Sequence, residues 1–255
     1  MRIGILGAGW LGSALAHFLK DNNQQVKVST RSVAKQRQLQ NQHLQTYLVQ
    51  IKEDKIDGDL SFFESIDILV VSLIPQDLSI FKQVVCEVLK QNIPHVVVLS
   101  STGIYNGCEG TVTESTLLKA ENPKVALLQS IEALFLNHNG FTSTILRLGG
   151  LIGPNRHPVH YLVKKEVISN ANEPVNILYQ NTFLTTFSAL LKAKMQHTIF
   201  NLVEKDHRTK EAFYTESSLK FGYKLPPFLA TSSPKNRLVS TEKIEHFLSL
   251  KLNSD

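Results

Sequence analysis

Residues 1–12 decide the fold, and they read Met1-Arg-Ile-Gly-Ile-Leu-Gly-Ala-Gly-Trp-Leu-Gly12. Residues 2–6 form an apolar run typical of a short buried strand, and Gly7, Gly9 and Gly12 follow it in the spacing G-x-G-x-x-G. The next apolar side chains recur at the spacing of one helix face; they are Leu11, Ala14, Leu15, Phe18 and Leu19. A strand, a glycine turn and a helix in this order predict a dinucleotide-binding unit.

Each glycine of this turn has its own physical task in such a unit. Gly7 permits the tight turn, Gly9 lets a pyrophosphate approach the backbone, and Gly12 lets the helix pack close to the strand. Trp10 and Leu11 open the helix, so the free N–H groups and the positive dipole end would hold the phosphates there. The alternative is an ordinary glycine turn of an α/β protein, but the correct flanks on both sides favour dinucleotide binding.

The end of the second strand decides between NAD and NADP. In dinucleotide folds a carboxylate about 20 residues after the glycines usually holds the adenosine ribose and selects NAD. Here Thr30, Arg31 and Ser32 occupy this place, followed by Lys35 and Arg37. Arg31 can form an ion pair with a 2′-phosphate. No acidic residue stands at residues 30–32 to repel that phosphate. We therefore expect NADP rather than NAD as cofactor, the alternative being a solvated basic loop.

Apolar runs typical of strands alternate with segments typical of helices through residue 99. The strands are expected at residues 26–29, 44–51, 66–74 and 96–99, and the helices at residues 33–42 and 76–91. This alternation predicts an α/β fold with a Rossmann-type, doubly wound parallel sheet. Leu73, Ile74 and Pro75 lie at the end of one of these strands, where such sheets bind ligands, so we expect them as an apolar wall beside the adenosine.

Composition restricts the classes of function. The 255-residue chain is 42% hydrophobic and 19% charged, which is ordinary for a globular protein with a large core. No apolar run is long enough to cross a bilayer, and the first strand begins at residue 2, so we expect neither a membrane segment nor a leader. Cys86 and Cys108 cannot form a disulfide framework or a zinc site alone, and the nine histidines are scattered, so we expect no metal and a cytoplasmic protein. The net charge of +5 comes without basic runs interleaved with aromatics, which argues against nucleic acid and suits phosphorylated ligands.

Two later segments carry a resemblance to a known family. Residues 100–107 read Ser-Ser-Thr-Gly-Ile-Tyr-Asn-Gly, and residues 145–154 read Ile-Leu-Arg-Leu-Gly-Gly-Leu-Ile-Gly-Pro. The first resembles the serine-rich loop after the fifth strand of extended short-chain dehydrogenase/reductases, in the NAD-dependent epimerase/dehydratase group. The second resembles that group's sixth strand and the Tyr-Gly-Pro segment after it, with Ile152 where the tyrosine often stands. Glu114, Asn201 and the run Lys235-Asn-Arg237 also fit, and the sequence is most similar to the small atypical YeeZ-like branch.

The sequence departs from this family where the catalytic pair should lie. The family uses a Tyr-x-x-x-Lys pair on the helix after the serine-rich loop. Aligned on Glu132, this pair falls on Lys124 and Leu128. A leucine can neither hydrogen-bond a ribose nor stabilise a phenolate, so the standard proton relay is not encoded at these positions.

The serine-rich loop offers substitutes for the missing pair. By the resemblance, Ser100 lies beside the cofactor, and Ser101, Thr102 and Tyr105 are the candidate catalytic residues. A tyrosine hydroxyl has a pKa of about 10, and without a neighbouring lysine it is a poor base at neutral pH. Tyr105 can instead be a half-buried aromatic side chain of the loop.

Residues 154–255 are expected to form a small C-terminal α/β lid on the substrate side, packed on a Rossmann core of residues 1–153. Arg147, Arg156 and His157 lie at or just after the sixth strand and are the candidate contacts to an anionic substrate. The alternative is that the Gly-Pro and His-Pro pairs only shape a turn and that Arg156 is solvated. Apolar spacing predicts further helices at residues 161–168, 182–194, 208–221 and 240–250, and strands at residues 174–179 and 199–203.

Three functions fit these observations. The first is an NADP-dependent oxidoreductase or nucleotide-sugar epimerase-like enzyme with a non-standard active site, acting on a carbonyl compound or a nucleotide sugar. The second is a non-catalytic NADP(H) sensor or scaffold. The third is a reductase of the pyrroline-carboxylate or hydroxyacid type. Residues 3–12 resemble the opening of those families, but their second domain is mostly helical, whereas the tail of this sequence is rich in strands. The resemblance also implies a homodimer, for which the apolar helix expected at residues 122–137 offers a face.

Overall fold

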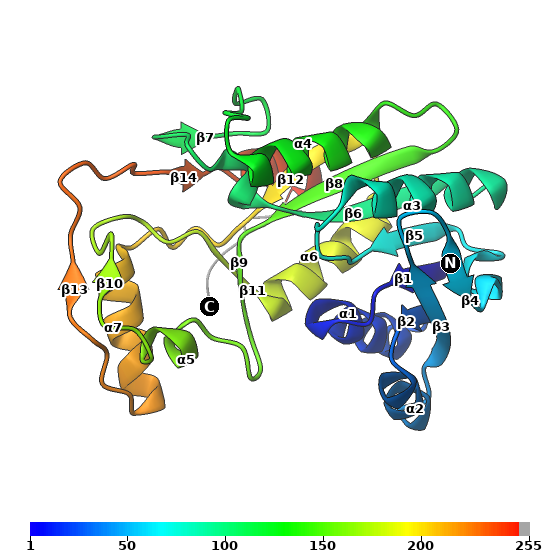
Figure 1. Ribbon diagram of the computed structural model, residues 1–255, viewed down its shortest axis with the longest axis horizontal. Helices are drawn as coiled ribbons and strands as arrows, with labels where there is room; N and C mark the ends of the chain where they lie inside the picture. Colours follow the sequence, from blue (N-terminus) through cyan, green and yellow to red (C-terminus); the bar gives the residue numbers. More distant parts are fainter. Residues whose placement is uncertain (250–255) are drawn as a thin grey trace.

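The computed structural model describes residues 1–249, and its centre is an eight-stranded sheet with helices on both faces (Figure 1). The strand order is β12-β8-β6-β5-β1-β2-β3-β4, in which β4 runs antiparallel to β3 and the other neighbours are parallel. This is the doubly wound parallel sheet that the sequence predicts. Its strands are β1 Arg2–Leu6, β2 Gln25–Thr30, β3 Gln45–Ile51, β4 Ile56–Gly58, β5 Ile68–Val71, β6 His95–Ser101, β8 Thr142–Leu148 and β12 Thr198–Leu202.

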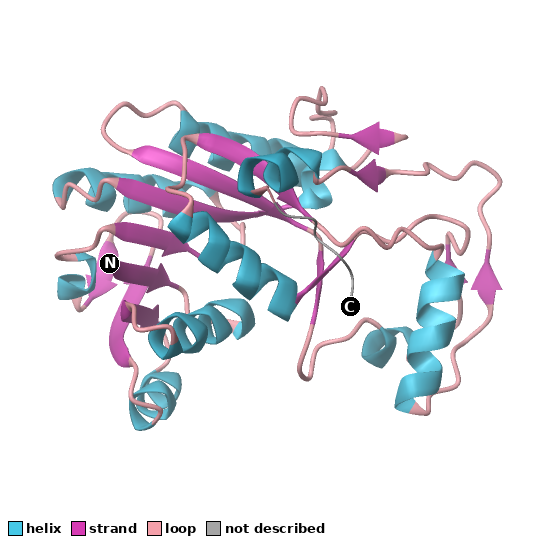
Figure 2. Ribbon diagram, turned by 180° about the vertical axis from the view of Figure 1, so that it is seen from behind, coloured by secondary structure: helices cyan, strands magenta, loops and turns pink. Residues whose placement is uncertain are grey.

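The inner strands are buried on both faces, because helices cover the sheet from two sides (Figures 1 and 2). In β5, Ile68 and Val70 join the core beneath α1 and α6, whereas Leu69 and Val71 join the core beneath α3 and α4. This explains why such strands appear in the sequence as continuous apolar runs. The helices of the two layers are α1 Trp10–Asp21, α2 Val33–Asn41, α3 Leu78–Lys90, α4 Pro123–Leu136, α6 Gln180–Lys192 and α8 Glu242–Leu248.

A second region lies to one side of the sheet and consists of short elements (Figure 1). It contains three two-stranded pairs, β9 with β11, β10 with β13, and β7 with β14. The bounds of its elements, with one short 3₁₀ helix, are η2 Thr102–Tyr105, β7 Thr111–Val112, β9 Gly150–Ile152, α5 Val159–Leu162, β10 Ile168–Ser169, β11 Ile177–Tyr179, α7 Lys210–Phe221, β13 Phe228–Leu229 and β14 Leu238–Val239. A second 3₁₀ helix, η1 Leu60–Phe63, belongs to the main sheet, where it contacts β2 and β3.

One expectation about the second half of the chain needs correction. The helix predicted at residues 161–168 is wrong, because α5 is a single turn that starts at Val159 and because Ile168 pairs with Phe228 in a strand. The sheet also does not end at residue 153, since β12 pairs with β8 and α6 packs beside α1. The division into residues 1–153 and 154–255 stays a prediction, and β12 belongs to the main sheet although it lies after residue 153. The last predicted helix includes Leu250, which lies outside the described residues.

Within residues 1–249, no helix combines the length and the apolar character that a bilayer crossing requires. In the same residues, no three side chains of His, Cys, Asp or Glu gather in a way that could hold a metal ion. Cys86 is exposed and Cys108 is buried, and both are free thiols.

Candidate functional site

The glycine turn between β1 and α1 has the geometry that a dinucleotide pyrophosphate requires. Gly7 has a φ of +108°, and a Cβ there would lie 2.6 Å from the carbonyl oxygen of Ser72. A Cβ on Gly12 would lie 2.1 Å from the Gly7 carbonyl oxygen, so α1 approaches the turn closely only because this residue is glycine. A Cβ on Gly9, by contrast, would have no protein atom within 4 Å. The space above Gly9 is thus open to a ligand, as the motif predicts.

The first turn of α1 faces this open space. Gly9 is the N-cap residue and has no side chain to satisfy the free N–H groups, and no acidic residue lies in the first turn. Leu11 is only 6% exposed and packs in the core, so what it can offer a ligand is its backbone N–H. Trp10 is partly buried, and its Nε1 donates to the Pro154 carbonyl oxygen at 2.9 Å. The uncapped helix end and the glycine turn together fit a pyrophosphate.

The end of β2 and the start of α2 form the predicted adenosine side. Thr30 is buried, and its Oγ1 accepts a hydrogen bond from the Ser32 backbone N–H. Ser32 caps α2, because its Oγ accepts from the backbone N–H of Lys35 at 3.3 Å. Arg31, between them, is exposed and makes no ion pair within residues 1–249. A free guanidinium at a helix N-terminus fits an added phosphate group.

The residues after β5 supply an apolar surface at the same end of the sheet. Leu73 is partly buried against the core, whereas Ile74 has 77% of its surface exposed and Pro75 is also exposed. A large apolar side chain left this open beside the ends of parallel strands suits contact with a flat ligand ring.

The serine-rich loop after β6 opens into a cleft of about 750 Å³. Ser101 and Thr102 line this cleft, and the Ser101 Oγ accepts from the backbone N–H of Gly103 at 3.0 Å. Most of the charged residues in the remaining lining are cations; the charged residues are Lys119, Glu121, Glu173, Lys210, Lys235 and Arg237. Glu173 is already paired with Lys210 at 2.8 Å, so the cleft keeps an excess of positive charge.

Arg237 is the site residue that the sequence reasoning missed as a candidate contact. Its Nη1 donates to the Tyr105 carbonyl oxygen at 2.9 Å and to Asn106 Oδ1 at 3.0 Å. Its Nε is buried without a hydrogen-bond partner in the described part of the chain, and burial lowers the pKa of its guanidinium. A buried cation that forms no salt bridge within residues 1–249 favours an anionic ligand, although Glu173 acts on it from a distance. The signal available in the sequence was the Lys-Asn-Arg run, which was noted only as a family match.

Tyr105, a predicted catalytic residue, lies inside the protein rather than in the cleft. It is fully buried, its hydroxyl donates to Asn201 Oδ1 at 2.7 Å, and it accepts from Arg147 Nη1 at 2.7 Å. Burial raises the pKa of Tyr105, and the nearby Arg147 only partly opposes this rise. A tyrosine held between two partners away from the cleft is not placed to exchange a proton with a substrate. The observed contacts of Tyr105 are those of a buried structural group, and its catalytic role stays a prediction.

Arg147, a predicted substrate contact, belongs to the same buried network. It is 3% exposed, its Nη2 forms an ion pair with Glu132 Oε2 at 2.7 Å, and its Nε lies 3.1 Å from both Glu132 oxygens. Ser100, predicted beside the cofactor, donates from its Oγ to Glu132 Oε1 at 2.6 Å. Each of the three side-chain nitrogens of Arg147 donates to Glu132 or Tyr105 inside the protein. The observed contacts of Arg147 connect Glu132 of α4 to Tyr105 after β6, and its role in substrate binding stays a prediction.

The positions of the family's catalytic pair have different environments here. Lys124 is exposed in the first turn of α4. Leu128 is 8% exposed and packs in an apolar cluster with Ile104 and Val203. The place of the family's lysine is thus part of a hydrophobic core, and a cation there would be costly to bury.

The two remaining predicted substrate residues, Arg156 and His157, differ in exposure. His157 is 7% exposed, stacks on Phe213, and its Nδ1 accepts from the Val159 backbone N–H at 3.2 Å. Burial lowers the pKa of His157, and a contact of this ring with an anion stays a prediction. Arg156 is exposed, and its guanidinium lies over the Trp10 ring at 5.1 Å from the centroid, beside the glycine turn.

Residues 2–114 match the family model described as NAD-dependent glycerol-3-phosphate dehydrogenase N-terminus. The chain is 27% identical over 254 residues to Protein YeeZ of Escherichia coli (strain K12), and the match covers 95% of this chain and 92% of that protein. Its structure is similar to UDP-glucuronic acid 4-epimerase from Bacillus cereus in complex with NAD, with a TM-score of 0.81 at 18% identity over 100% of this chain and 94% of that one. A functionally unknown conserved protein from Silicibacter pomeroyi DSS gives a TM-score of 0.81 at 16% identity over 98% and 93% of the two chains. The chain is therefore a homologue of YeeZ, and its fold is that of the NAD-dependent epimerase/dehydratase proteins.

Proposed function

We propose that the protein is an NADP(H)-dependent enzyme of the epimerase/dehydratase type that acts on a nucleotide sugar or another small anionic carbonyl compound. The observation that carries this proposal is the cleft of about 750 Å³ in which the hydroxyls of Ser101 and Thr102 meet a surplus of cations. Ser101 at the carboxyl end of β6 lines this cleft, and the carboxyl ends of parallel strands are where this kind of fold binds its ligands.

The cofactor half of the proposal is supported by the glycine turn and by the end of β2. Gly9 leaves open space beside the uncapped start of α1, which suits the pyrophosphate of either dinucleotide. The Bacillus cereus epimerase was solved with NAD. The preference for NADP therefore depends on Arg31, an exposed cation without an ion pair in residues 1–249, at the place where a carboxylate would select NAD.

The substrate half is supported by Arg237 and Lys235, which line the cleft together. A diphosphate offers oxygens to both cations and would compensate the buried guanidinium. One similar structure is that of a Bacillus cereus UDP-glucuronic acid 4-epimerase in complex with UDP-glucuronic acid and NAD. We infer a substrate of comparable size and charge for this cleft.

The residues of this chain would bind, orient and donate protons. Bound nicotinamide would supply hydride transfer at a carbon that bears a hydroxyl or a carbonyl. The Ser101 Oγ accepts from Gly103 N–H, which leaves its own proton to donate to a substrate oxygen. Neither Ser101 nor Thr102 has a lysine in the family's position to lower its pKa, because Leu128 occupies that position. We therefore expect slow chemistry compared with members that carry the pair.

A second function, a non-catalytic NADP(H) sensor or scaffold, is favoured by one observation. The apolar packing of Leu128 with Ile104 and Val203 is a finished hydrophobic cluster and not a damaged catalytic site. A sensor would bind NADP(H) without turnover and would change its contact with a partner protein on binding. A homodimer through α4 fits either function, although Val125, Leu128, Ile131 and Phe135 of that helix are buried within the chain.

Calorimetric titration of the full chain with NADPH and NADH tests the cofactor half. We expect both to bind, NADPH more tightly, and we expect Arg31→Ala to remove the difference. The absence of heat for both dinucleotides at millimolar concentration would refute the enzyme and the sensor together.

Turnover then separates the two functions. Wild type and Ser101→Ala are incubated with NADPH or NADP and a panel of carbonyl compounds and nucleotide sugars. The enzyme proposal requires turnover by wild type that Ser101→Ala reduces while dinucleotide binding is unchanged. Binding without turnover over the whole panel favours the sensor.

A further inference from the structure

A tight turn of the substrate-side region is fixed against the glycine turn. Gly153 N donates to the Arg156 carbonyl oxygen and Arg156 N donates to the Gly153 carbonyl oxygen, each at 2.9 Å. Asn155 between them has a φ of +57°, which asparagine tolerates better than most residues. This closed turn gives the backbone of Arg156 one defined position.

Trp10 connects this turn to the start of α1. Its Nε1 donates to the Pro154 carbonyl oxygen at 2.9 Å, across 144 residues of sequence. Gly153 makes room for the indole, because a Cβ there would lie 2.9 Å from a ring carbon of Trp10. The indole is therefore a fixed platform between the dinucleotide turn and the turn at residues 153–156.

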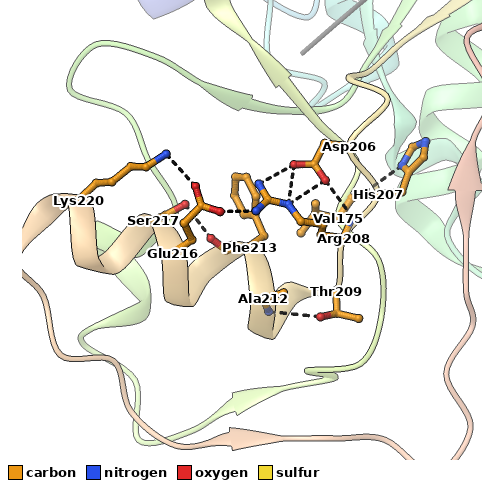
Figure 3. A network of polar contacts seen from close by, with 10 residues as sticks. All are labelled: Val175, Asp206, His207, Arg208, Thr209, Ala212, Phe213, Glu216, Ser217 and Lys220. Carbon is orange, nitrogen blue, oxygen red and sulfur yellow. Dashed lines mark hydrogen bonds and ion pairs between the residues drawn. The ribbon is translucent and has the colours of Figure 1, made fainter. Parts of the chain in front are cut away.

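Arg156 lies on this platform with free hydrogen-bonding capacity. Its Cζ is 5.1 Å from the Trp10 ring centroid. Within residues 1–249, the one hydrogen bond of its side chain is from Nε to the Leu151 carbonyl oxygen at 3.3 Å. Arg208 makes the opposite arrangement, shown in Figure 3. It lies over Phe213, and Asp206 and Glu216 use its donors from two sides. Of these two arginines stacked on rings, only Arg156 lacks a carboxylate partner within residues 1–249.

We propose that Arg156, held on Trp10, binds the pyrophosphate that NADH and NADPH share. This inference rests on the proposed dinucleotide function and adds a residue from the far side of the sequence to that site. A guanidinium can offer two parallel N–H donors to a phosphate, and stacking on an indole fixes its plane before the ligand arrives. The cofactor then bridges α1 and the turn at residues 153–156, which couples cofactor binding to the position of the substrate-side region. Arg156 is in this role a cofactor-binding residue and not a substrate contact.

The test uses the two dinucleotides as its internal comparison. NADH and NADPH have the same pyrophosphate and differ at the 2′-phosphate. Arg156→Ala should weaken the binding of NADH and of NADPH by the same factor, about tenfold. Arg31→Ala should weaken the binding of NADPH alone. Arg156→Lys should recover only part of the loss, because lysine keeps the charge but not the two-pronged geometry. Arg208→Ala, an exposed arginine on an aromatic ring in the same region, should change neither affinity.

Trp10 is the sole tryptophan of the chain, so its fluorescence reports directly from this site. Quenching of Trp10 on titration gives the affinities, and calorimetry repeats them independently of any change that Arg156→Ala itself makes in the emission. Circular dichroism and urea unfolding show that each variant is folded.

Each outcome has one meaning. Equal weakening of both dinucleotides supports the proposal. Unchanged affinities in Arg156→Ala, with Arg31→Ala still selective, overturn it and leave the dinucleotide function intact. Weakening of NADPH alone, or of UDP-glucuronic acid but of neither dinucleotide, also overturns it. If wild type binds no dinucleotide at millimolar concentration, the proposed function fails and this inference fails with it.

Discussion

Glu132 and Arg147 form a buried ion pair beneath the loop that carries Ser101. Both side chains are 4% exposed, and Ser100 and Tyr105 use the remaining hydrogen-bonding positions of the pair. Burying two charges is costly, so such a pair adds little net stability over an apolar pair, but removal of one partner leaves the other charge without compensation. The network therefore acts mainly by fixing the position of the loop.

We predict that Glu132→Gln lowers the free energy of unfolding by about 3–5 kcal/mol, because Arg147 then keeps a buried charge without a counter-ion. Urea unfolding followed by circular dichroism measures this. The matched control is Arg2→Ala, which breaks the exposed pair with Asp67 and should leave stability near that of wild type. Similar midpoints for the two variants would contradict this role of the buried pair.

His95 is a second residue whose effect on stability can be predicted. It lies between Thr142 Oγ1 at 2.6 Å and Thr144 Oγ1 at 3.0 Å, and burial first, then His197, lowers its pKa to about 4. The unfolded chain, with a pKa of 6.5 for this group, binds the proton more readily. The contribution of His95 is thus complete above pH 6.5 and is lost as the pH falls toward 4.

We therefore expect wild type to be less stable at pH 5 than at pH 7.5, with about 2 kcal/mol of the loss due to His95. His95→Gln should show a smaller loss between the same two pH values. Urea unfolding of both proteins at each pH gives the comparison, which also removes the contribution of the other histidines. Parallel losses in the two proteins would show that His95 does not set this dependence.

At the scale of elements, α1 and its glycine turn separate the requirements of folding from those of binding. Gly12 is needed because α1 packs on the turn, whereas the space beside Gly9 is bounded by no protein atom within 4 Å. The backbone of Gly9, with φ of −69° and ψ of −169°, is one that alanine can adopt. The two glycines of one motif thus serve different purposes.

We predict that Gly9→Ala stays within about 1 kcal/mol of wild-type stability and loses dinucleotide affinity, because its methyl group fills the space that the pyrophosphate needs. Gly12→Ala should lose both stability and dinucleotide affinity, since its methyl group would clash with the Gly7 carbonyl oxygen. Thermal unfolding and NADPH titration on the same samples distinguish the two variants. Equal destabilisation by both would mean that the open space beside Gly9 is absent in solution.

The sequence was informative about elements wherever local spacing determines them. The apolar runs and helix faces through residue 99 predict the alternating strands and helices of the structure, because each pattern depends on neighbours a few residues away. The helix predicted at residues 161–168 is wrong because Ile168 is held by Phe228, 60 residues later. Distant pairings of this kind leave no periodic signal.

The same limit applies to the site. The glycine turn is a local motif, so the sequence located it together with Arg31. The sequence predicts Arg147 and Tyr105 at the site, because Arg147 lies near the end of the sixth strand and Tyr105 follows the fifth. Their burial depends on Glu132 and Asn201, which other elements bring to them. The excess charge of the cleft likewise comes from residues as distant as Lys119 and Arg237.

For the whole molecule, the return of the chain to the sheet decides what can fold independently. β12 pairs with β8, and Phe183 and Phe187 of α6 and Ile244 of α8 belong to the core beneath α1. A fragment of residues 1–153 would expose that face of the sheet to water, at a cost of roughly 1.5–3 kcal/mol for each large apolar side chain left uncovered.

We therefore predict that residues 1–153, expressed alone, do not form a cooperatively folded domain. Circular dichroism and urea unfolding of the fragment, compared with the full chain, measure this. A sharp unfolding transition of the fragment would show instead that the boundary at residue 153 separates two folding units.

The central position of β1 also has a consequence for synthesis on the ribosome. The central strand β1 is synthesised first, and later strands add outward on each side of it. β8 follows β6, and about 50 further residues are synthesised before β12, which pairs with β8. During that interval the buried strand β8 presents a row of unpaired N–H and C=O groups, which is a template for pairing with another nascent chain. Chaperone protection of the nascent polypeptide should matter most in this interval, and it should become dispensable once residues 198–202 have emerged and closed the edge.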